Sequence, residues 1–377
     1  MIDRIIHSSI AERMFGGRAI IILGPRQSGK TTLVKKILGQ YKGIGSYFNC
    51  DELETRKLFS AENVSSLKSI IGKNKLIMLD EAQKLDNAGL IIKLIVDNIP
   101  NTQVIATGSS AFELSDKLNE PLTGRKWEYQ LMPFAFEELS AHTSTITEVS
   151  SLQKRLLYGS YPEVINNPGS ESEVLSELSS SYLYKDVFVL NDIRKPELVE
   201  KLLTALALQV SAEVSFNELA QLLLGDPTTI ERYILMLERA FIIFRLTNYS
   251  TNQRNEIKKS RKIYFYDNGI RNALLADFRP VDLRDDIGKL WENYLVSEFR
   301  KRNANHRKQC KTHFWRSISS GEIDYLELMN AQINAYEIKW NVRKKPSVKS
   351  FINQYPKAIV QTVNPDNYFL LLQDNSQ

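Results

Sequence analysis

The first 140 residues alternate between short apolar runs and longer amphipathic stretches. Five of the runs are rich in aliphatic and aromatic residues and predict β-strands. They lie at residues 19–23, 47–50, 75–79, 103–107 and 128–131. Because helical patterns separate these runs, we expect a parallel sheet with helices on its faces, which is an α/β fold.

The rest of the chain carries longer helical patterns and fewer strands. Residues 150–191 read as helices, and residues 197–250 predict three helices that lead into a β-hairpin. Three helices followed by a hairpin are typical of a winged helix. The last third predicts a long helix at 287–301, a basic loop, and two strands at 322–328 and 333–340.

Length and composition narrow the class of protein. A chain of 377 residues suggests two or three domains. No apolar run approaches the roughly 20 residues that span a bilayer, so we expect no membrane contact. The N-terminus up to Arg13 carries charges and does not resemble a signal peptide. Cys50 and Cys310 form no disulfide framework, and together these features predict a cytoplasmic protein.

The net charge of +5 is unevenly distributed. Residues 251–351 contain 21 Lys and Arg against 12 Asp and Glu, an excess of nine positive charges, so the remainder is acidic. A basic segment on an otherwise acidic chain favours a phosphate-backbone partner, namely DNA. The alternative is a lysine-rich surface that only contacts solvent.

The segment from Gly24 to Thr31 fits the phosphate-binding pattern G-x-x-x-x-G-K-[ST] without a mismatch. A predicted strand precedes it and a predicted helix follows it, which is the setting that the pattern requires. Glycines let backbone N–H groups turn toward phosphate oxygens, and the helix N-terminus adds positive potential. We expect Lys30 to contact the β- and γ-phosphates of ATP and Thr31 to bind Mg²⁺. The predicted nucleotide-binding residues are Gly24, Gln27, Ser28, Gly29, Lys30, Thr31 and Thr32.

Two carboxylates, Asp80 and Glu81, follow a run of four apolar residues. Ligands of parallel sheets bind at the carboxyl ends of the strands, where this pair is placed. We expect Asp80 to hold the Mg²⁺ shell and Glu81 to orient or deprotonate the attacking water. ATP and Mg²⁺ are therefore the predicted cofactors of an ATP hydrolase.

Three further polar residues are candidates for this site. Ser109 and Ser110 follow the next strand, where a polar side chain can sense the γ-phosphate; the sequence does not separate the two, and helix capping is the alternative. Arg125 precedes the last strand of the sheet and can act on a neighbouring subunit's nucleotide as an arginine finger. A surface salt bridge is the alternative for Arg125. A finger acting between subunits implies a homo-oligomer, such as a hexameric ring.

Several motifs occur in an order that resembles a known family. They are Gly24 to Leu33, Asp80 to Gln83, Thr107 to Ser110, Leu122 to Arg125, Gly159 to Pro162, Tyr264 to Gly269, and Glu337 to Lys339. The chain is similar over nearly its whole length to prokaryotic AAA-type ATPases of the AAA+ superfamily that carry a C-terminal domain of unknown function.

The resemblance implies a domain order. It implies an AAA+ P-loop core at residues 1–140, a helical lid at 141–192, a winged helix at 193–270 and an α+β nuclease-like domain at 271–377. In related ATPases a glycine-x-proline turn lies over the adenine, which implies that Pro162 contacts the base.

A second constellation lies near the C-terminus. Glu337 and Lys339 are two residues apart on one predicted strand and face the same side, and antiparallel pairing brings Asp324 beside them. Two carboxylates and a lysine suit Mg²⁺ and a scissile phosphate, and Glu292 on the preceding helix could add a third carboxylate. The order resembles PD-(D/E)xK nucleases, although Ile323 stands where the leading proline belongs. A solvated ion pair, or a docking platform that does not cleave, is the alternative.

Basic residues surround this constellation. They are Arg300, Lys301, Arg302, Arg307, Lys308, Lys311 and residues 343–345, with Arg254, Lys258, Lys259, Arg261 and Lys262 on the predicted wing. The second helix of the predicted winged helix is not notably basic, so we expect phosphate contacts rather than base-specific reading.

The leading hypothesis from the sequence is a Mg²⁺-dependent AAA+ ATPase that translocates on DNA or remodels it, with a nuclease-like domain that binds DNA. A rival is a nucleotide-dependent regulatory switch that binds a protein partner through its winged-helix and C-terminal domains. A third hypothesis is a metal-dependent DNA endonuclease that ATP regulates.

Overall fold

The computed structural model describes residues 1–60, 63–109, 122–183, 195–250, 261–317, 321–341 and 348–373. It divides into two compact units. We call residues 1–133 with 239–241 the N-terminal unit, and residues 134–238 with 242–377 the C-terminal unit. In the described part of the chain, no helix combines the length and the apolar character that crossing a membrane requires.

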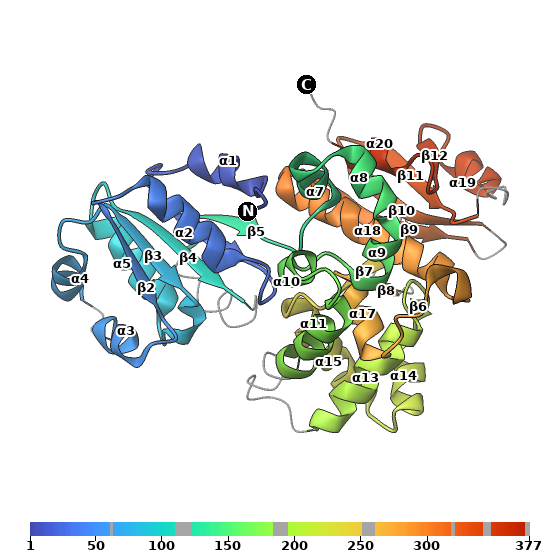
Figure 1. Cartoon of the computed structure of the whole chain (residues 1–377), viewed down its shortest axis with the longest axis horizontal. Helices are drawn as coiled ribbons and strands as arrows, with labels where there is room; N and C mark the ends of the chain where they lie inside the picture. The colour runs from blue at the N-terminus through green and yellow to red at the C-terminus, as the bar shows by residue number, and fades with distance from the viewer. Residues whose placement is uncertain are drawn as a thin grey trace. The chain divides into compact units, whose positions relative to one another are not determined.

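Among its described residues, the N-terminal unit contains a parallel sheet of five strands. Figure 1 shows β2, β3, β4 and β5 of this sheet, whose strand order is β2-β3-β4-β1-β5. The strands are β1 (Ala19–Leu23), β2 (Gly45–Asn49), β3 (Leu76–Asp80), β4 (Gln103–Gly108) and β5 (Lys126–Gln130). All five strands that the sequence predicts are confirmed. The central strands β1, β3 and β4 are buried throughout, which explains their continuous apolar runs.

Helices cover this sheet. The described helices are α1 (Ile6–Ala11), α2 (Lys30–Gln40), α3 (Leu53–Leu58), α4 (Val64–Ile71), the short η1 (Ala82–Lys84) and α5 (Ala88–Asn98). Ile20 and Ile22 of β1 share a buried core with Ile6 of α1 and Leu33 of α2. Since strand residues two apart lie on one face, α1 and α2 cover the same side of β1.

The C-terminal unit contains many helices and a second sheet. Its described helices are α7 (Phe136–His142), α8 (Thr145–Ser150), α9 (Leu152–Tyr158), α10 (Pro162–Asn166), α11 (Glu171–Glu177), the π-helical η2 (Leu178–Leu183), α13 (Pro196–Leu208), α14 (Phe216–Leu222), α15 (Pro227–Arg239), α17 (Asn268–Leu274), η3 (Val281–Leu283), α18 (Ile287–Asn305), α19 (Lys349–Gln354) and α20 (Tyr368–Leu372). The three helices predicted before the hairpin are therefore present as α13, α14 and α15. Residues 251–260 of the predicted wing lie outside the described part of the chain, whereas Arg261 and Lys262 belong to β8.

The second sheet has seven strands in the order β12-β11-β10-β9-β7-β8-β6. They are β6 (Glu213–Val214), β7 (Ile243–Asn248), β8 (Arg261–Phe265), β9 (Lys311–Arg316), β10 (Glu322–Met329), β11 (Gln332–Ile338) and β12 (Ile359–Val363). The hairpin β7–β8 joins the C-terminal strands because β7 pairs in parallel with β9 at Thr247–His313 and Asn248–Phe314. The long helix α18 packs against β8 and β11 of this sheet (Figure 1).

One element was predicted wrongly. The basic loop expected after the long helix contains strand β9, which pairs with both β10 and β7. Its charged ends, Lys311 and Arg316, suggest a loop, but Phe314 and Trp315 are buried inside the sheet. The short apolar centre between charged ends hides the strand in the sequence. Strand β12 was not predicted either.

Two glycine-containing turns of the C-terminal unit, at Gly159 and Gly269, pack closely against each other. The carboxylate of Asp267 accepts hydrogen bonds from the backbone N–H groups of Ser160 and Gly269, both at 2.8 Å. A Cβ atom on Gly159, where φ is +68°, would lie 1.8 Å from Asp267 Oδ1. A Cβ atom on Gly269 would lie 2.2 Å from the carbonyl oxygen of Tyr158. Both positions therefore require glycine, because a Cβ atom would clash with the Asp267 side chain at Gly159 and with the Tyr158 carbonyl group at Gly269.

This contact predicts a large cost for Gly159→Ala. We expect it to lower the free energy of unfolding of the C-terminal unit by about 3 kcal/mol or more, because strain at positive φ and a clash with Asp267 add together. Gly169→Ala is the matched control, since φ there is +97° with no atom within 4 Å, and we expect a loss of about 1 kcal/mol. Urea unfolding in a Trp127→Phe background reports on this unit because the three other tryptophans lie in it. If both variants lose the same free energy of unfolding, the close contact between Gly159 and Asp267 does not have this effect.

Candidate functional site

The phosphate-binding loop runs from the end of β1 to the start of α2. Gln27 has φ +53° and Gly29 has φ +95°, so the loop turns twice through the left-handed region. Gly24 passes so close to the backbone that a Cβ atom there would lie 2.0 Å from the carbonyl oxygen of Leu131. The loop thus brings backbone N–H groups to the N-terminus of α2, the arrangement that binds phosphate.

Lys30 starts helix α2 and is only 4% exposed. Its Nζ donates hydrogen bonds to the carbonyl oxygens of Gly24 at 2.9 Å and Pro25 at 2.7 Å. The Ser28 hydroxyl donates to the same Pro25 oxygen at 2.8 Å. The ammonium group therefore lies against the loop, where phosphate oxygens would be within its reach, and Thr32 lies on the exposed side of α2.

Asp80 is the centre of the hydrogen-bond network beside this loop. Its Oδ2 accepts from the hydroxyl of Thr31 at 2.7 Å and from that of Tyr47 at 2.6 Å. Its Oδ1 accepts from the hydroxyl of Thr107. The structure thus brings Thr31 and Asp80 together, as expected for two residues that hold Mg²⁺. This donor set of hydroxyl and carboxylate oxygens fits a hard cation such as Mg²⁺.

Glu81 lies beside Asp80 in a left-handed backbone conformation with φ +53°. Its N–H donates to Thr107 Oγ1 at 3.1 Å. Its Oε2 accepts from Gln83 Nε2 at 2.5 Å and from the Ser109 hydroxyl at 3.2 Å. Ser109 therefore contacts Glu81 directly, whereas Ser110 falls outside the described residues.

Sequence reasoning missed Tyr47, Gln83 and Thr107 as parts of this network. Thr107 ends β4 just as Asp80 ends β3, and the parallel pairing of these strands was a usable signal. Tyr47 gave no such signal because it lies inside β2 rather than at its end. Burial and the hydrogen bond to Asp80 raise the pKa of Tyr47, so its hydroxyl stays protonated and continues to donate.

The other two candidates of the predicted ATP site stay predictions. Arg125 forms an ion pair with Asp97 at 2.7 Å inside the N-terminal unit, and its side chain is 41% exposed. Pro162 begins helix α10 and belongs to the C-terminal unit, where Tyr161 precedes it as the N-cap residue.

The acidic cluster of the C-terminal unit contains four carboxylates from three elements: Glu292 of α18, Glu322 and Asp324 of β10, and Glu337 of β11. Lys339 follows β11, and its Nζ lies 2.5 Å from Glu337 Oε1 and 3.8 Å from Asp324 Oδ2. Asp324 Oδ2 also accepts from the backbone N–H of Ile338 at 2.7 Å. The antiparallel pairing of β10 and β11 thus brings Asp324, Glu337 and Lys339 together as the sequence predicts.

A further lysine lies inside this cluster. Lys262 of β8 places its Nζ 2.9 Å from Glu292 Oε1, 2.5 Å from Glu322 Oε1 and 3.7 Å from Asp324 Oδ1. The prediction of Lys262 as a phosphate-binding residue on the wing is therefore wrong. Among the described residues, no group of three or more Asp, Glu, His or Cys side chains is arranged to hold a metal ion. The residues here do not fit the metal that the nuclease resemblance implies.

Burial disfavours the ionised carboxylates of this cluster. It raises the pKa of Glu292 to about 7, against the lowering effect of Lys262. It likewise raises the pKa of Glu337 to about 7, and the nearby Asp324 adds to the rise. Burial alone would lower the pKa of Lys262, but the Glu292 carboxylate and the other acidic groups raise it well above its usual value. Lys262 therefore stays charged, while part of the acidic charge is removed by protonation.

The expected basic surface is smaller than the sequence suggests. Lys301 is buried and bonds to Glu298 at 2.7 Å, and Arg302 is buried and pairs with Glu327 at 2.8 Å. Arg300 stacks over the ring of Phe244 at 4.7 Å. These three residues of α18 thus make contacts inside the fold, and Lys301 and Arg302 are buried. Lys311 remains exposed, Arg307 and Lys308 are half-buried, and residues 254, 258, 259 and 343–345 lie outside the described part.

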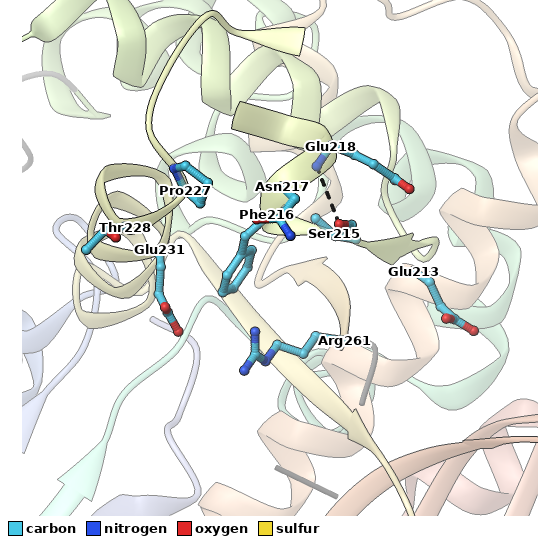
Figure 2. A pocket seen from close by; sticks show the side chains of 10 residues that line it. Glu213, Ser215, Phe216, Asn217, Glu218, Pro227, Thr228, Glu231 and Arg261 are labelled. Carbon is cyan, nitrogen blue, oxygen red and sulfur yellow. Dashed lines mark hydrogen bonds between the residues drawn. The ribbon is translucent and has the colours of Figure 1, made fainter. Parts of the chain in front are cut away.

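A pocket of about 510 Å³ lies between α14, α15 and β8 (Figure 2). Glu213, Glu218 and Glu231 line it, with Arg261 placed 4.7 Å from the centroid of the Phe216 ring. Glu213 also pairs with Arg316 at 2.8 Å, so three carboxylates face two guanidinium groups, and the small excess of negative charge disfavours a phosphate backbone at this face.

Comparisons with known proteins relate each part of the chain to a family. Residues 16–140 match a family described as an AAA domain, and residues 149–281 and 287–373 match the domains of unknown function DUF8612 and DUF4143. An uncharacterized protein of Haemophilus influenzae is 25% identical over 90% of this chain and 88% of its own length. The uncharacterized protein Rv2008c of Mycobacterium tuberculosis is 24% identical over 85% of this chain and 70% of its own.

Two solved structures show only remote similarity. The Pif1 helicase from Candida albicans gives a TM-score of 0.27 at 15% identity, with 48% of each chain covered, so this chain spans about half of the helicase. A Drosophila ORC structure with DNA and Cdc6 gives 0.25 at 11% identity, with 72% of this chain and 90% of that chain covered. The AAA match over residues 16–140, the phosphate loop and the placement of Asp80 beside Thr31 together support an AAA-type P-loop ATPase domain in the N-terminal unit.

Proposed function

We propose that this protein is a Mg²⁺-dependent ATPase that acts on DNA. The observation that carries the ATPase assignment is the network that joins Thr31, Asp80 and Glu81 at one edge of a parallel sheet. The carboxyl edge of such a sheet is where ligands bind, and the phosphate-binding loop opens at the same edge. Two carboxylates with different surroundings at one phosphate site suit hydrolysis as well as binding.

The residues of this site have distinct roles in the proposal. The backbone of residues 24–31 and the ammonium group of Lys30 bind and orient the phosphates. Thr31 and Asp80 hold Mg²⁺, which neutralises phosphate charge when it is bound with ATP. Glu81 takes a proton from the attacking water. Since Gln83 and Ser109 both donate to Glu81 Oε2, we assign Oε1 to that water.

The proposal includes a homo-oligomer. Arg125 directly precedes β5, its side chain is 41% exposed, and it pairs with Asp97. An exposed ion pair of this kind is worth little in free energy, so Arg125 can exchange Asp97 for a phosphate of a neighbouring subunit at small cost. A ring in which Arg125 acts on the adjacent nucleotide would use this arginine as a finger.

The DNA part of the proposal is supported by charge. The excess of nine positive charges over residues 251–351 is opposite in sign to the remainder of the chain. Since Arg300, Lys301, Arg302 and Lys262 are engaged inside the fold, we assign the contacts to the exposed Lys311 and to the basic residues outside the described part. Contacts of this kind are to the phosphate backbone and are independent of sequence.

A second candidate is a nucleotide-dependent switch that binds a protein. The observation that favours it is a set of exposed leucines on the C-terminal unit, with Leu224 93%, Leu222 63% and Leu208 59% exposed. Exposed apolar side chains close in sequence at the ends of α13 and α14 suit a protein partner better than DNA.

Lys30→Ala and Glu81→Gln test the ATPase. We expect Lys30→Ala to abolish ATP binding, because the loop loses its charged phosphate contact. We expect Glu81→Gln to bind ATP normally but to hydrolyse it about 100-fold more slowly or worse, since a general base contributes on that order. Steady-state phosphate release and equilibrium nucleotide binding measure both, with Lys42→Ala, an exposed change after α2, as the control. A Glu81→Gln variant with the wild-type rate would remove Glu81 from the mechanism.

The DNA assignment predicts a salt-dependent interaction. We expect duplex, single-stranded or branched DNA to stimulate ATP hydrolysis several-fold at low salt, and the effect to fade near physiological salt. Lys311→Ala should reduce the slope of log K against log salt by about 1 for DNA binding, with no change in the basal ATPase rate. Lys68→Ala, an exposed change on α4, should leave the slope unchanged. If no DNA form alters the rate, the protein-binding switch becomes the better hypothesis.

A further inference from the structure

Lys262 occupies the middle of the acidic cluster rather than its rim. Oxygens of Glu292, Glu322 and Asp324 lie 2.9, 2.5 and 3.7 Å from its Nζ. These carboxylates come from α18 and β10, whereas Lys262 comes from β8 on the far side of β9 and β7 in the strand order. Carboxylates from separate elements therefore converge on one ammonium group.

The surroundings of Lys262 hold its side chain in this position. Its side chain is 3% exposed, and Nζ lies 5.6 Å from the centroid of the Phe314 ring of β9, within range of a cation–π contact. The hydroxyl of Tyr264, also on β8, donates to the same Glu292 oxygen at 2.8 Å. A buried ammonium group paired this closely is costly to move, since both it and its carboxylates would be left uncompensated.

A divalent cation would compete for the same space. Mg²⁺ binds oxygens at about 2.0–2.1 Å in an octahedral shell, usually from one or two carboxylates and several waters, and that shell needs room. Here three carboxylates already direct an oxygen toward Nζ, and a metal ion placed among them would lie next to a positive charge. Lys339, the lysine that the nuclease pattern requires, is a separate residue that contacts Glu337 and Asp324.

We propose that Lys262 is the resident cation of this cluster, that its ammonium group takes the place of the metal ion of PD-(D/E)xK nucleases, and that this face does not cleave DNA. The two lysines have different positions: Lys262 lies among Glu292, Glu322 and Asp324, and Lys339 lies at the Glu337 edge. The inference depends on neither ATP hydrolysis nor DNA binding.

One carboxylate oxygen of the cluster distinguishes a resident lysine from a bound metal. In the described part of the chain, Glu337 Oε2 is buried without a hydrogen-bond partner. With Lys262 as the resident cation, Lys339 pairs with Oε1 of Glu337 at 2.5 Å, and no metal ligates Oε2. If a metal were instead the native partner of this oxygen, wild-type protein would bind it through Asp324 and Glu337.

The experiment is a Mn²⁺ titration of the full chain at pH 8, followed by calorimetry and by the electron paramagnetic resonance signal of free Mn²⁺. All variants carry Asp80→Asn, which removes the proposed Mg²⁺ ligand of the nucleotide site, so that this site does not contribute to the Mn²⁺ signal. We expect no Asp324-dependent site in this background up to about 1 mM Mn²⁺. Lys262→Met should gain one Mn²⁺ site with a Kd at least tenfold below that 1 mM limit. The reason is that four carboxylates then face a single lysine. Adding Asp324→Asn should abolish the gain, and Lys262→Arg should show none.

Several results would overturn the proposal. One such result is Mn²⁺ binding by protein that still contains Lys262, provided that the Asp324→Asn change removes this binding. It would show that a metal binds beside the lysine. Nicking of supercoiled plasmid by the wild-type chain, if Asp324→Asn abolishes it, would show that this face cleaves DNA. Should Lys262→Met fail to fold by circular dichroism, Lys262→Gln replaces it, and the comparison of the parent protein with Asp324→Asn is unaffected. A folded Lys262→Gln variant without a new Mn²⁺ site would also refute the resident-cation assignment.

Discussion

The cost of burying charge is the constraint on which both candidate sites depend. A buried carboxylate must be hydrogen-bonded, paired with a cation or protonated, since each alternative is less costly than leaving it alone. Asp80 is satisfied by three hydroxyl groups from Thr31, Tyr47 and Thr107. The acidic cluster is satisfied by the ammonium groups of Lys262 and Lys339 together with protonation. The two solutions have opposite consequences for metal binding.

Neutral donors leave the charge of a carboxylate in place. The three hydroxyl groups orient Asp80 without cancelling its negative charge, so the site keeps an electrostatic preference for a cation. In the acidic cluster, Lys262 cancels charge directly and fills the space between Glu292, Glu322 and Asp324. Similar residue types at strand ends thus predict Mg²⁺ in the N-terminal unit and argue against it in the C-terminal unit. The partner of the carboxylates, rather than their number, makes the difference.

This difference explains which features the sequence could predict. The strand–loop–helix setting of residues 24–31 and the five strands of the N-terminal sheet depend on local patterns, and both are confirmed. The pairing of Asp324 with Glu337 and Lys339 was predictable from a hairpin of known spacing. Lys262 was not, because it reaches the cluster from β8, which is about 60 residues away in sequence and separated from β10 by two strands. Strand β9 was missed for a related reason, since the buried Phe314 and Trp315 stand between charged residues.

The cost of burying charge also explains what attaches residues 134–160 to the rest of the C-terminal unit. Glu298 accepts from the backbone N–H of Phe136 at 2.7 Å, and Lys301 donates to the carbonyl of Phe134 at 3.1 Å and to the Ser160 hydroxyl at 2.9 Å. Asp267 holds the turn at Ser160 from the other side. A charged run on a helix such as Arg300 to Arg302 suggests a solvated surface when it is read locally. Because Lys301 lies between Glu298 and the backbone of an earlier segment, it binds that segment to α18, and its charge is used for folding rather than for a ligand.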